Sequence, residues 1–134
     1  MRIILSRSVL ENDLLRRVEE LSGEEVMACY QCGNCSAGCP AAGAMDLLPN
    51  QIIRLLQLGQ VEAALGARAI WYCAACLQCE ARCPKGIDLA RLTEALRTLA
   101  LEKGFRHVEI EELPPETLAE MPQQAFIGGF RKYT

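Results

Sequence analysis

Residues 29–40 read CYQCGNCSAGCP, and residues 73–84 read CAACLQCEARCP. Both segments have the spacing C-x2-C-x2-C-x3-C-P, and all eight cysteines of the 134-residue chain fall within them. The other residues of the two segments barely match. The repeated element is therefore the spacing of the thiols, together with the proline that ends each run.

This spacing predicts two [4Fe–4S] clusters. Such a cluster needs four thiolates, and three closely spaced cysteines on a tight loop can bind three of its irons. In two-cluster ferredoxins with this spacing, the fourth cysteine of each run ligates the other cluster. Applied to this chain, the pattern gives two crossed ligand sets, Cys29, Cys32, Cys35 and Cys83 for cluster 1, and Cys73, Cys76, Cys79 and Cys39 for cluster 2. The crossed ligand sets would connect the two halves of a small domain through the clusters, so we expect the metal-free chain to fold poorly.

Small residues in the first loop agree with this interpretation. Gly33, Ala37 and Gly38 let backbone amides approach the sulfur atoms, and such N–H···S bonds help to set a reduction potential. Zinc is the main alternative metal, but zinc sites generally pair C-x2-C elements across a longer stretch. Disulfides are a weaker alternative in a chain with no export signal.

Composition narrows the class of protein. An apolar fraction of 51% and a charged fraction of 23% are typical of a globular domain. No apolar run approaches the roughly 18 residues of a membrane span, and no secretory signal is present. We therefore expect a soluble, cytoplasmic protein. The formal net charge of −3 argues against nucleic acid as the main partner.

Between and around the cysteine runs, the apolar pattern is helical, and an all-α fold is predicted. An N-terminal helix is expected over about 8–22, opened by a Ser8–Glu11 capping box and ended by Gly23. Further helices are expected from Pro49 to Gly59, over 61–65, and from the Asp88 cap to Gly104, the last with a stripe of Leu89, Leu92, Leu96 and Leu99. A weak strand signal covers 2–5.

The chain divides into a helical dicluster domain at 1–104, with its cluster core at 27–104, and an extension at 105–134. The extension contains Pro114-Pro115 and Gly128-Gly129, with Phe126, Ile127, Phe130 and Tyr133 crowded near its end. One interpretation is a frayed tail. The other is a docking arm for a partner, because a solvated tail has little use for so many apolar groups.

The remaining residues give weaker signals. Trp71 and Tyr72 are expected to pack in the core beside a cluster, and His107 to lie on the surface. The cations near the cysteine runs could offset the negative charge of the clusters or meet an acidic partner, but we expect an ordinary solvated face. They are Arg54, Arg68, Arg82, Lys85 and Arg91. The sequence contains no phosphate loop, no nucleophile–base pair and no flavin fingerprint, so we predict no substrate site and no catalytic residue in this chain.

Residues 29–40 resemble the first motif of the HdrC-like family, the dicluster [4Fe–4S] ferredoxins of heterodisulfide reductases. Residues 70–73 (IWYC) and 82–87 (RCPKGI) resemble its second motif, and the resemblance covers about 27–104. It implies an all-α ferredoxin fold and a relay of single electrons. The electrons would pass between a flavoprotein subunit (HdrA-like) and a disulfide-reducing subunit with Cys-Cys-Gly motifs (HdrB-like). Those motifs are absent here, so a disulfide-cleaving site would lie on another chain.

Three alternatives stay open at this point. The first is a relay subunit of a quinone-linked succinate-, fumarate- or glycolate-type oxidoreductase, although such subunits usually carry a [2Fe–2S] or Cys-Cys-Gly domain in the same chain. The second is a zinc-stabilised adaptor, and the third is a free ferredoxin shuttle. The sequence leaves the terminal acceptor, the direction of electron flow and the reduction potentials open.

Overall fold

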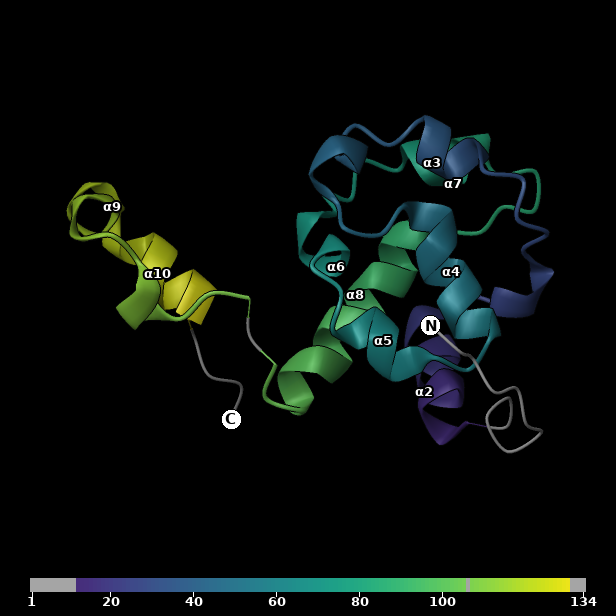
Figure 1. Ribbon diagram of the computed structural model, residues 1–134, viewed down its shortest axis with the longest axis horizontal. Coiled ribbons are helices and arrows are strands. Elements are labelled where there is room, and N and C mark those ends of the chain that lie inside the picture. Colours follow the sequence, from purple (N-terminus) through teal and green to yellow (C-terminus); the bar gives the residue numbers. More distant parts are fainter. Residues whose placement is uncertain (1–11, 106, 131–134) are drawn as a thin grey trace.

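The computed structural model describes residues 12–105 and 107–130, and every regular element in that part of the chain is a helix (Figure 1). The all-α prediction is confirmed. The elements are α2 (Asp13–Ser22), η1 (Val26–Ala28), α3 (Asn34–Ala37), η2 (Ala42–Ala44), α4 (Pro49–Gln57), α5 (Val61–Leu65), α6 (Ala69–Tyr72), α7 (Gln78–Arg82), α8 (Leu89–Glu102), η3 (Ile110–Glu112), α9 (Pro115–Glu120) and α10 (Gln123–Phe130). The strand signal at 2–5 lies outside the described residues.

Helix α2 begins later than the sequence predicted. Asn12 has an extended backbone, and its side chain accepts a hydrogen bond from Leu14 N at 2.9 Å, so it caps a helix that starts at Asp13. The expected start at Ser8 lies outside the described residues. The predicted end is confirmed, because Gly23 adopts a left-handed conformation (φ 71°) that a helix C-terminus favours.

The two helices that frame the core have their predicted boundaries. Helix α4 begins at Pro49, where a proline loses no helical hydrogen bond. Helix α8 is capped by Asp88, whose Oδ1 accepts hydrogen bonds from Ala90 N at 2.8 Å and Arg91 N at 3.2 Å. Helix α5 also matches the expected range 61–65.

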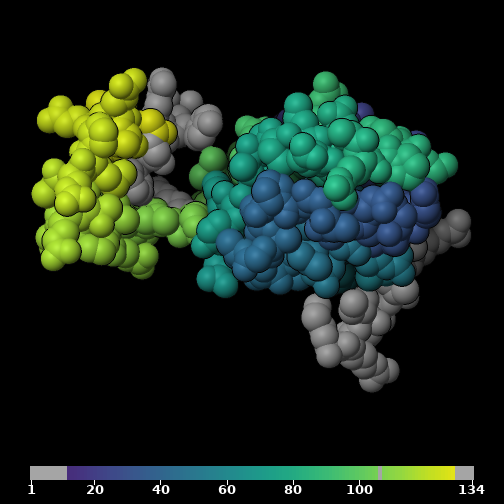
Figure 2. All heavy atoms as spheres, turned by 90° about the horizontal axis from the view of Figure 1, so that it is seen from above, coloured from purple at the N-terminus to yellow at the C-terminus, as the bar shows by residue number. Residues whose placement is uncertain are grey.

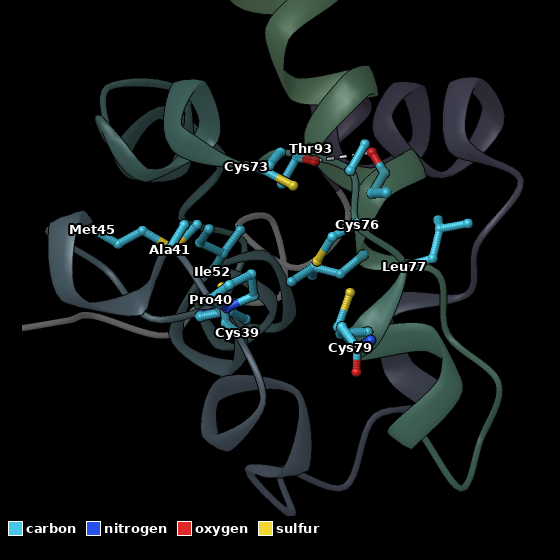
Figure 3. A pocket seen from close by; sticks show the side chains of 16 residues that line it. Cys39, Pro40, Ala41, Met45, Ile52, Cys73, Cys76, Leu77, Cys79 and Thr93 are labelled. Carbon is cyan, nitrogen blue, oxygen red and sulfur yellow. Dashed lines mark hydrogen bonds between the residues drawn. The ribbon is translucent and has the colours of Figure 1, made fainter.

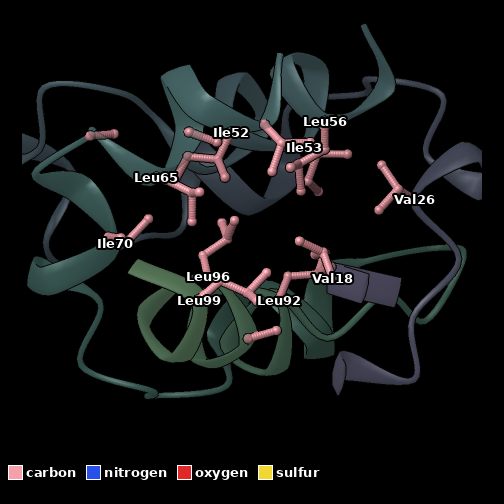
Figure 4. Close-up of a cluster of buried hydrophobic side chains, with 14 of the residues drawn as sticks. Val18, Val26, Ile52, Ile53, Leu56, Leu65, Ile70, Leu92, Leu96 and Leu99 are labelled. Atoms are coloured by element: carbon pink, nitrogen blue, oxygen red, sulfur yellow. The ribbon is translucent and has the colours of Figure 1, made fainter. Parts of the chain in front are cut away.

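The hydrophobic core lies between α4 and α8 (Figure 4). Ile52 and Leu56 from α4 face Leu92 and Leu96 from α8, and all four side chains are at most 1% exposed. Burying one such side chain contributes about 1.5–3 kcal/mol. Helix α2 lies along α8 and adds Val18, while α5 and α6 close the other end. The predicted leucine stripe of α8 is buried as expected.

The cysteine runs lie on one side of this core. Helix α3 comes from the first run and α7 from the second, and the two pack side by side next to the N-terminal end of α4. Segments more than 40 residues apart in sequence are thus brought into contact. This arrangement places both thiol-bearing loops in one layer of the molecule.

The extension after residue 104 contains helices that the sequence analysis did not predict. Pro115 occupies the first turn of α9, and Pro122 directly precedes α10. A proline in the first turn loses no helical bond, so these prolines start helices here rather than breaking them. Figure 2 shows α9 and α10 set to one side of the core. Among the described residues, no helix has the length and apolar character needed to cross a membrane.

Candidate metal centres

The two cysteine loops share a backbone conformation as well as a spacing. Gln31 and Ala75 hold equivalent positions, and both have positive φ, at 62° and 51°. Gly33 and Leu77 are the next equivalent pair, with φ of 81° and 62°, and they precede α3 and α7. Left-handed backbone is unfavourable for leucine. The two loops therefore share a backbone shape as well as the thiol spacing, although their other side chains differ.

The second centre is a hollow between the two runs (Figure 3). Four cysteines line it, Cys73, Cys76 and Cys79 from the second run and Cys39 from the first. The rest of the wall is mainly apolar and includes Ile52 of α4 and Leu89 of α8. The volume of this hollow, including the part that is open to solvent, is about 450 Å³. Four thiols around one apolar hollow are the donor set that a [4Fe–4S] cluster requires.

The first centre lies around Tyr30. Desolvation and the nearby thiols of Cys32, Cys83 and Cys29 raise the pKa of its hydroxyl, although the side chain is 59% exposed. Cys83 of the second run thus lies near Tyr30, which stands between Cys29 and Cys32 in the first run. The backbone N–H of Gln31 also donates to Cys29 Sγ at 3.4 Å, as expected for a cluster loop.

The thiols differ in exposure. Cys32 and Cys76, the second cysteine of each run, are exposed, and the other six are half-buried. Burial raises the pKa of the Cys35 and Cys79 thiols, so a metal must displace their protons when it binds. Among the described residues, no three His, Cys, Asp or Glu side chains converge on a single ion. A cubane does not need such a group, because each of its thiolates binds a different iron.

Arg97 holds the start of the second loop. From α8, its Nε donates to Ile70 O and its Nη2 to Cys73 O, each at 2.5 Å, while its Nη1 pairs with Glu94 at 3.6 Å. The whole side chain of Arg97 is 23% exposed. Arg97 could not be identified from local sequence patterns, because its target carbonyls are more than 20 residues away.

Two further polar residues that the sequence analysis missed hold the segments next to the loops. Asp46 accepts hydrogen bonds from Arg68 N (2.9 Å) and Ala69 N (2.7 Å), which fixes the first turn of α6 just before Cys73. Desolvation opposes ionisation, but these backbone bonds outweigh it and lower the pKa of Asp46. Ser36 of α3 accepts from Asn50 N at 3.0 Å and donates to its side chain at 2.6 Å.

The cations near the runs are exposed, as expected for a solvated face. Arg82 nevertheless packs on the first run, because a Cβ added to Gly38 would lie 2.5 Å from its Nε. Arg91 pairs with Asp88 and Glu24 at 3.6 and 3.9 Å. The solvated-face prediction therefore misses the contact that Arg82 makes between the two runs.

Aromatic residues join the extension to the second loop. Trp71 packs against the core as predicted, but Tyr72 is 38% exposed, so the prediction of a core position for Tyr72 is wrong. Both rings contact His107, which stacks on Trp71 at 6.0 Å between centroids and meets Tyr72 edge-on at 5.6 Å. His107 is exposed, as predicted, yet it covers the aromatic pair just before Cys73.

Comparison with known proteins agrees with this geometry. Residues 25–87 match the 4Fe–4S dicluster domain, and the eight cysteines fit two [4Fe–4S] clusters. HdrC of Methanopyrus kandleri, an iron–sulfur subunit of CoB–CoM heterodisulfide reductase, is 34% identical over 110 residues, which are 76% of this chain and 57% of that protein. These matches support assignment of the chain to the HdrC-like family of dicluster [4Fe–4S] ferredoxins.

Two other HdrC-like relatives have similar identity. The HdrC protein of the ferredoxin:CoB–CoM heterodisulfide reductase of Methanosarcina mazei is 34% identical over 102 residues, which cover 74% of this chain and 63% of the relative. An HdrC protein from Methanocaldococcus jannaschii is 31% identical over 97 residues, covering 69% and 52%. The chain thus spans somewhat more than half the length of each of these three relatives.

Proposed function

We propose that this chain is an electron-relay subunit of a heterodisulfide reductase-type complex. The observation that carries the proposal is the pairing of α3 with α7, which brings both cysteine loops into one layer. Bound [4Fe–4S] clusters each accept and release one electron. Two such sites side by side allow single electrons to pass through the chain.

The proposed ligand sets are crossed. The hollow lined by Cys73, Cys76, Cys79 and Cys39 supports the second set. The position of Cys83 near Tyr30, a residue of the first loop between Cys29 and Cys32, supports the first set, to which Cys35 is added from the same loop. The chain's own residues supply the thiolates, the backbone N–H donors and the apolar walls that limit water.

We propose that the partner proteins dock next to the two exposed cysteines. Cys32 and Cys76 are the most accessible thiols of their loops, and exposed apolar side chains flank them, Tyr30 beside the first and Leu77 beside the second. We propose a flavoprotein (HdrA-like) as electron donor and a Cys-Cys-Gly protein (HdrB-like) as the disulfide-reducing acceptor. The extension at 105–134 would contribute to docking, which is supported by the exposure of Ile110 and Ile127.

The test is anaerobic purification of the tagged chain from its native host, with identification of every protein that co-elutes. A flavoprotein together with a Cys-Cys-Gly protein supports the proposal. Recovery of only a membrane cytochrome or a carboxylate dehydrogenase would keep the clusters but move the function to quinone-linked respiration. A colourless preparation with about two zinc ions per chain would overturn it in favour of an adaptor.

A further inference from the structure

Gln57 is a buried amide at the end of α4 that faces the first cysteine loop. Its side chain is only 7% exposed. Nε2 donates to Cys29 O at 2.7 Å and to Val26 O at 3.1 Å. Both amide hydrogens are therefore used by backbone carbonyls, and this fixes which way the amide points.

The fixed orientation leaves Gln57 Oε1 as an acceptor aimed at a second glutamine. Gln31 Nε2 donates to this oxygen at 3.4 Å, and Arg54 Nη1 donates to it at the same distance. The side chain of Gln31 is thus held by a residue of α4 rather than turned into solvent.

Gln31 in turn lies on the sulfur of Cys29. Its Nε2 is 3.6 Å from Cys29 Sγ, and its backbone N is 3.4 Å from the same atom. One amide hydrogen can point to the sulfur while the other points to Gln57. Cys29 therefore receives a side-chain N–H in addition to the backbone N–H that the loop shape provides.

The second loop has no side-chain N–H donor at the equivalent position. Ala75 corresponds to Gln31 and shares its left-handed backbone, but its methyl group has no hydrogen to donate. The carbonyl of Cys73, equivalent to that of Cys29, is held by Arg97 instead. The two loops thus have the same shape but different polar groups around their first cysteine.

We propose that Gln31, oriented by Gln57, is a positioning residue that raises the reduction potential of the cluster bound through Cys29. Reduction adds negative charge that the ligating thiolates share, so an N–H donor stabilises the reduced state more than the oxidised one. The inference rests on the proposed function, because it requires Cys29 to be a cluster ligand. The inference concerns the effect of the Gln31 donor on the reduction potential of one cluster. It does not state which of the two clusters has the higher potential.

The test is an anaerobic redox titration of the full holoprotein, followed by electron paramagnetic resonance, for wild type and Gln31→Leu. Leucine can adopt this left-handed backbone in the folded chain, since Leu77 holds the same φ of 62° in the other loop. One of the two midpoints is expected to move to a more negative value while the other stays in place. Gln60→Leu, the same change at the residue before α5, is the matched control and should move neither midpoint.

Two further variants distinguish loss of the Gln31 donor from a general loosening of the packing around the loop. Gln31→Glu keeps the shape but replaces the donor by an anionic acceptor, so it should shift the same midpoint further in the same direction. Gln57→Met should shift this midpoint in the wild-type background and have no added effect in a Gln31→Leu background, because Gln57 acts through Gln31.

The outcomes distinguish the inference from the proposed function. Unchanged midpoints in both Gln31 variants, with two clusters present, would overturn the role of Gln31 and leave the relay standing. A shift of both midpoints by equal amounts would also overturn it, since that is the result of loosened packing. A wild-type protein without iron and sulfide would overturn both.

Discussion

The guanidinium of Arg82 lies directly against Gly38, across the contact between α7 and α3. Gly38 has a φ of −103°, so its backbone would accept alanine, and the three atoms nearest to an added Cβ all belong to the Arg82 side chain. Gly38→Ala should therefore push this exposed side chain aside and destabilise the pairing of the two loops by about 1 kcal/mol, the lower end of the cost of overpacking. The rate at which a chelator bleaches the cluster absorbance is the measurement, and Arg82→Ala in the same chain should restore the slower rate. Additive effects of the two changes would contradict this contact.

The crossed ligand sets can be tested by removing the fourth cysteine of either run. Cys83→Ala should halve the iron content and remove the cluster whose midpoint responds to Gln31→Leu. Cys39→Ala should also halve it but keep that responsive cluster. Iron analysis with redox titration of both variants is the check. If Cys83→Ala instead spared the Gln31-sensitive midpoint, each run would ligate its own cluster.

Arg97 should be important for stability. Replacement by leucine removes two charge-assisted hydrogen bonds and leaves the carbonyls of Ile70 and Cys73 without their partner, which costs about 2–3 kcal/mol. We expect faster thermal loss of cluster absorbance. Arg91→Leu is the matched control, because that arginine is 67% exposed and should change the rate little. Equal effects of the two variants would contradict the anchoring role.

Asp46 provides a pH-dependent test. Its pKa is lowered in the folded state, so its contribution is present above the unfolded value near 3.9 and is lost only as pH falls through the folded value. Asp46→Asn should destabilise the fold by about 1 kcal/mol, as loss of a helix cap does. The difference in thermal stability between variant and wild type should be constant from pH 8 to pH 5 and should shrink below about pH 4. A difference that stays constant as the pH falls below about 4 would show that the pKa is not lowered.

The extension gives a prediction about partners. Ile127 of α10 is 70% exposed, and Ile127→Asp should leave the iron content and both midpoints unchanged. It should reduce the amount of partner protein recovered with the tagged chain. Glu116→Asp, a conservative change on α9 of the same extension, is the control and should retain the partners. Full recovery with Ile127→Asp would exclude this face from docking.

Local features were predictable from the sequence. The Asp88 cap, the leucine stripe of α8 and the proline that opens α4 depend on neighbours within a few residues, and each is present as expected. The thiol spacing likewise predicted two [4Fe–4S] clusters, in agreement with the match to the 4Fe–4S dicluster domain. The start of α2 was missed because a competing cap, Asn12, lies four residues after Ser8.

Long-range polar contacts were not predictable. Gln57, Arg97 and Asp46 each bind backbone groups more than 20 residues away, and no local pattern marks such a pairing. The helices of the extension were also missed. Pro115 and Gly128 are helix breakers in most contexts, but here one opens α9 and the other lies within α10.

The hollow that joins Cys39 to Cys73, Cys76 and Cys79 also has a consequence for biosynthesis. On the proposed ligand sets, Cys39 leaves the ribosome well before its three partners, and Cys83 emerges well after the cysteines that it joins. Neither set is complete until the second run has been translated. Cluster insertion must then await nearly the whole domain, and a chain truncated between the two runs would retain four thiols but not one complete ligand set.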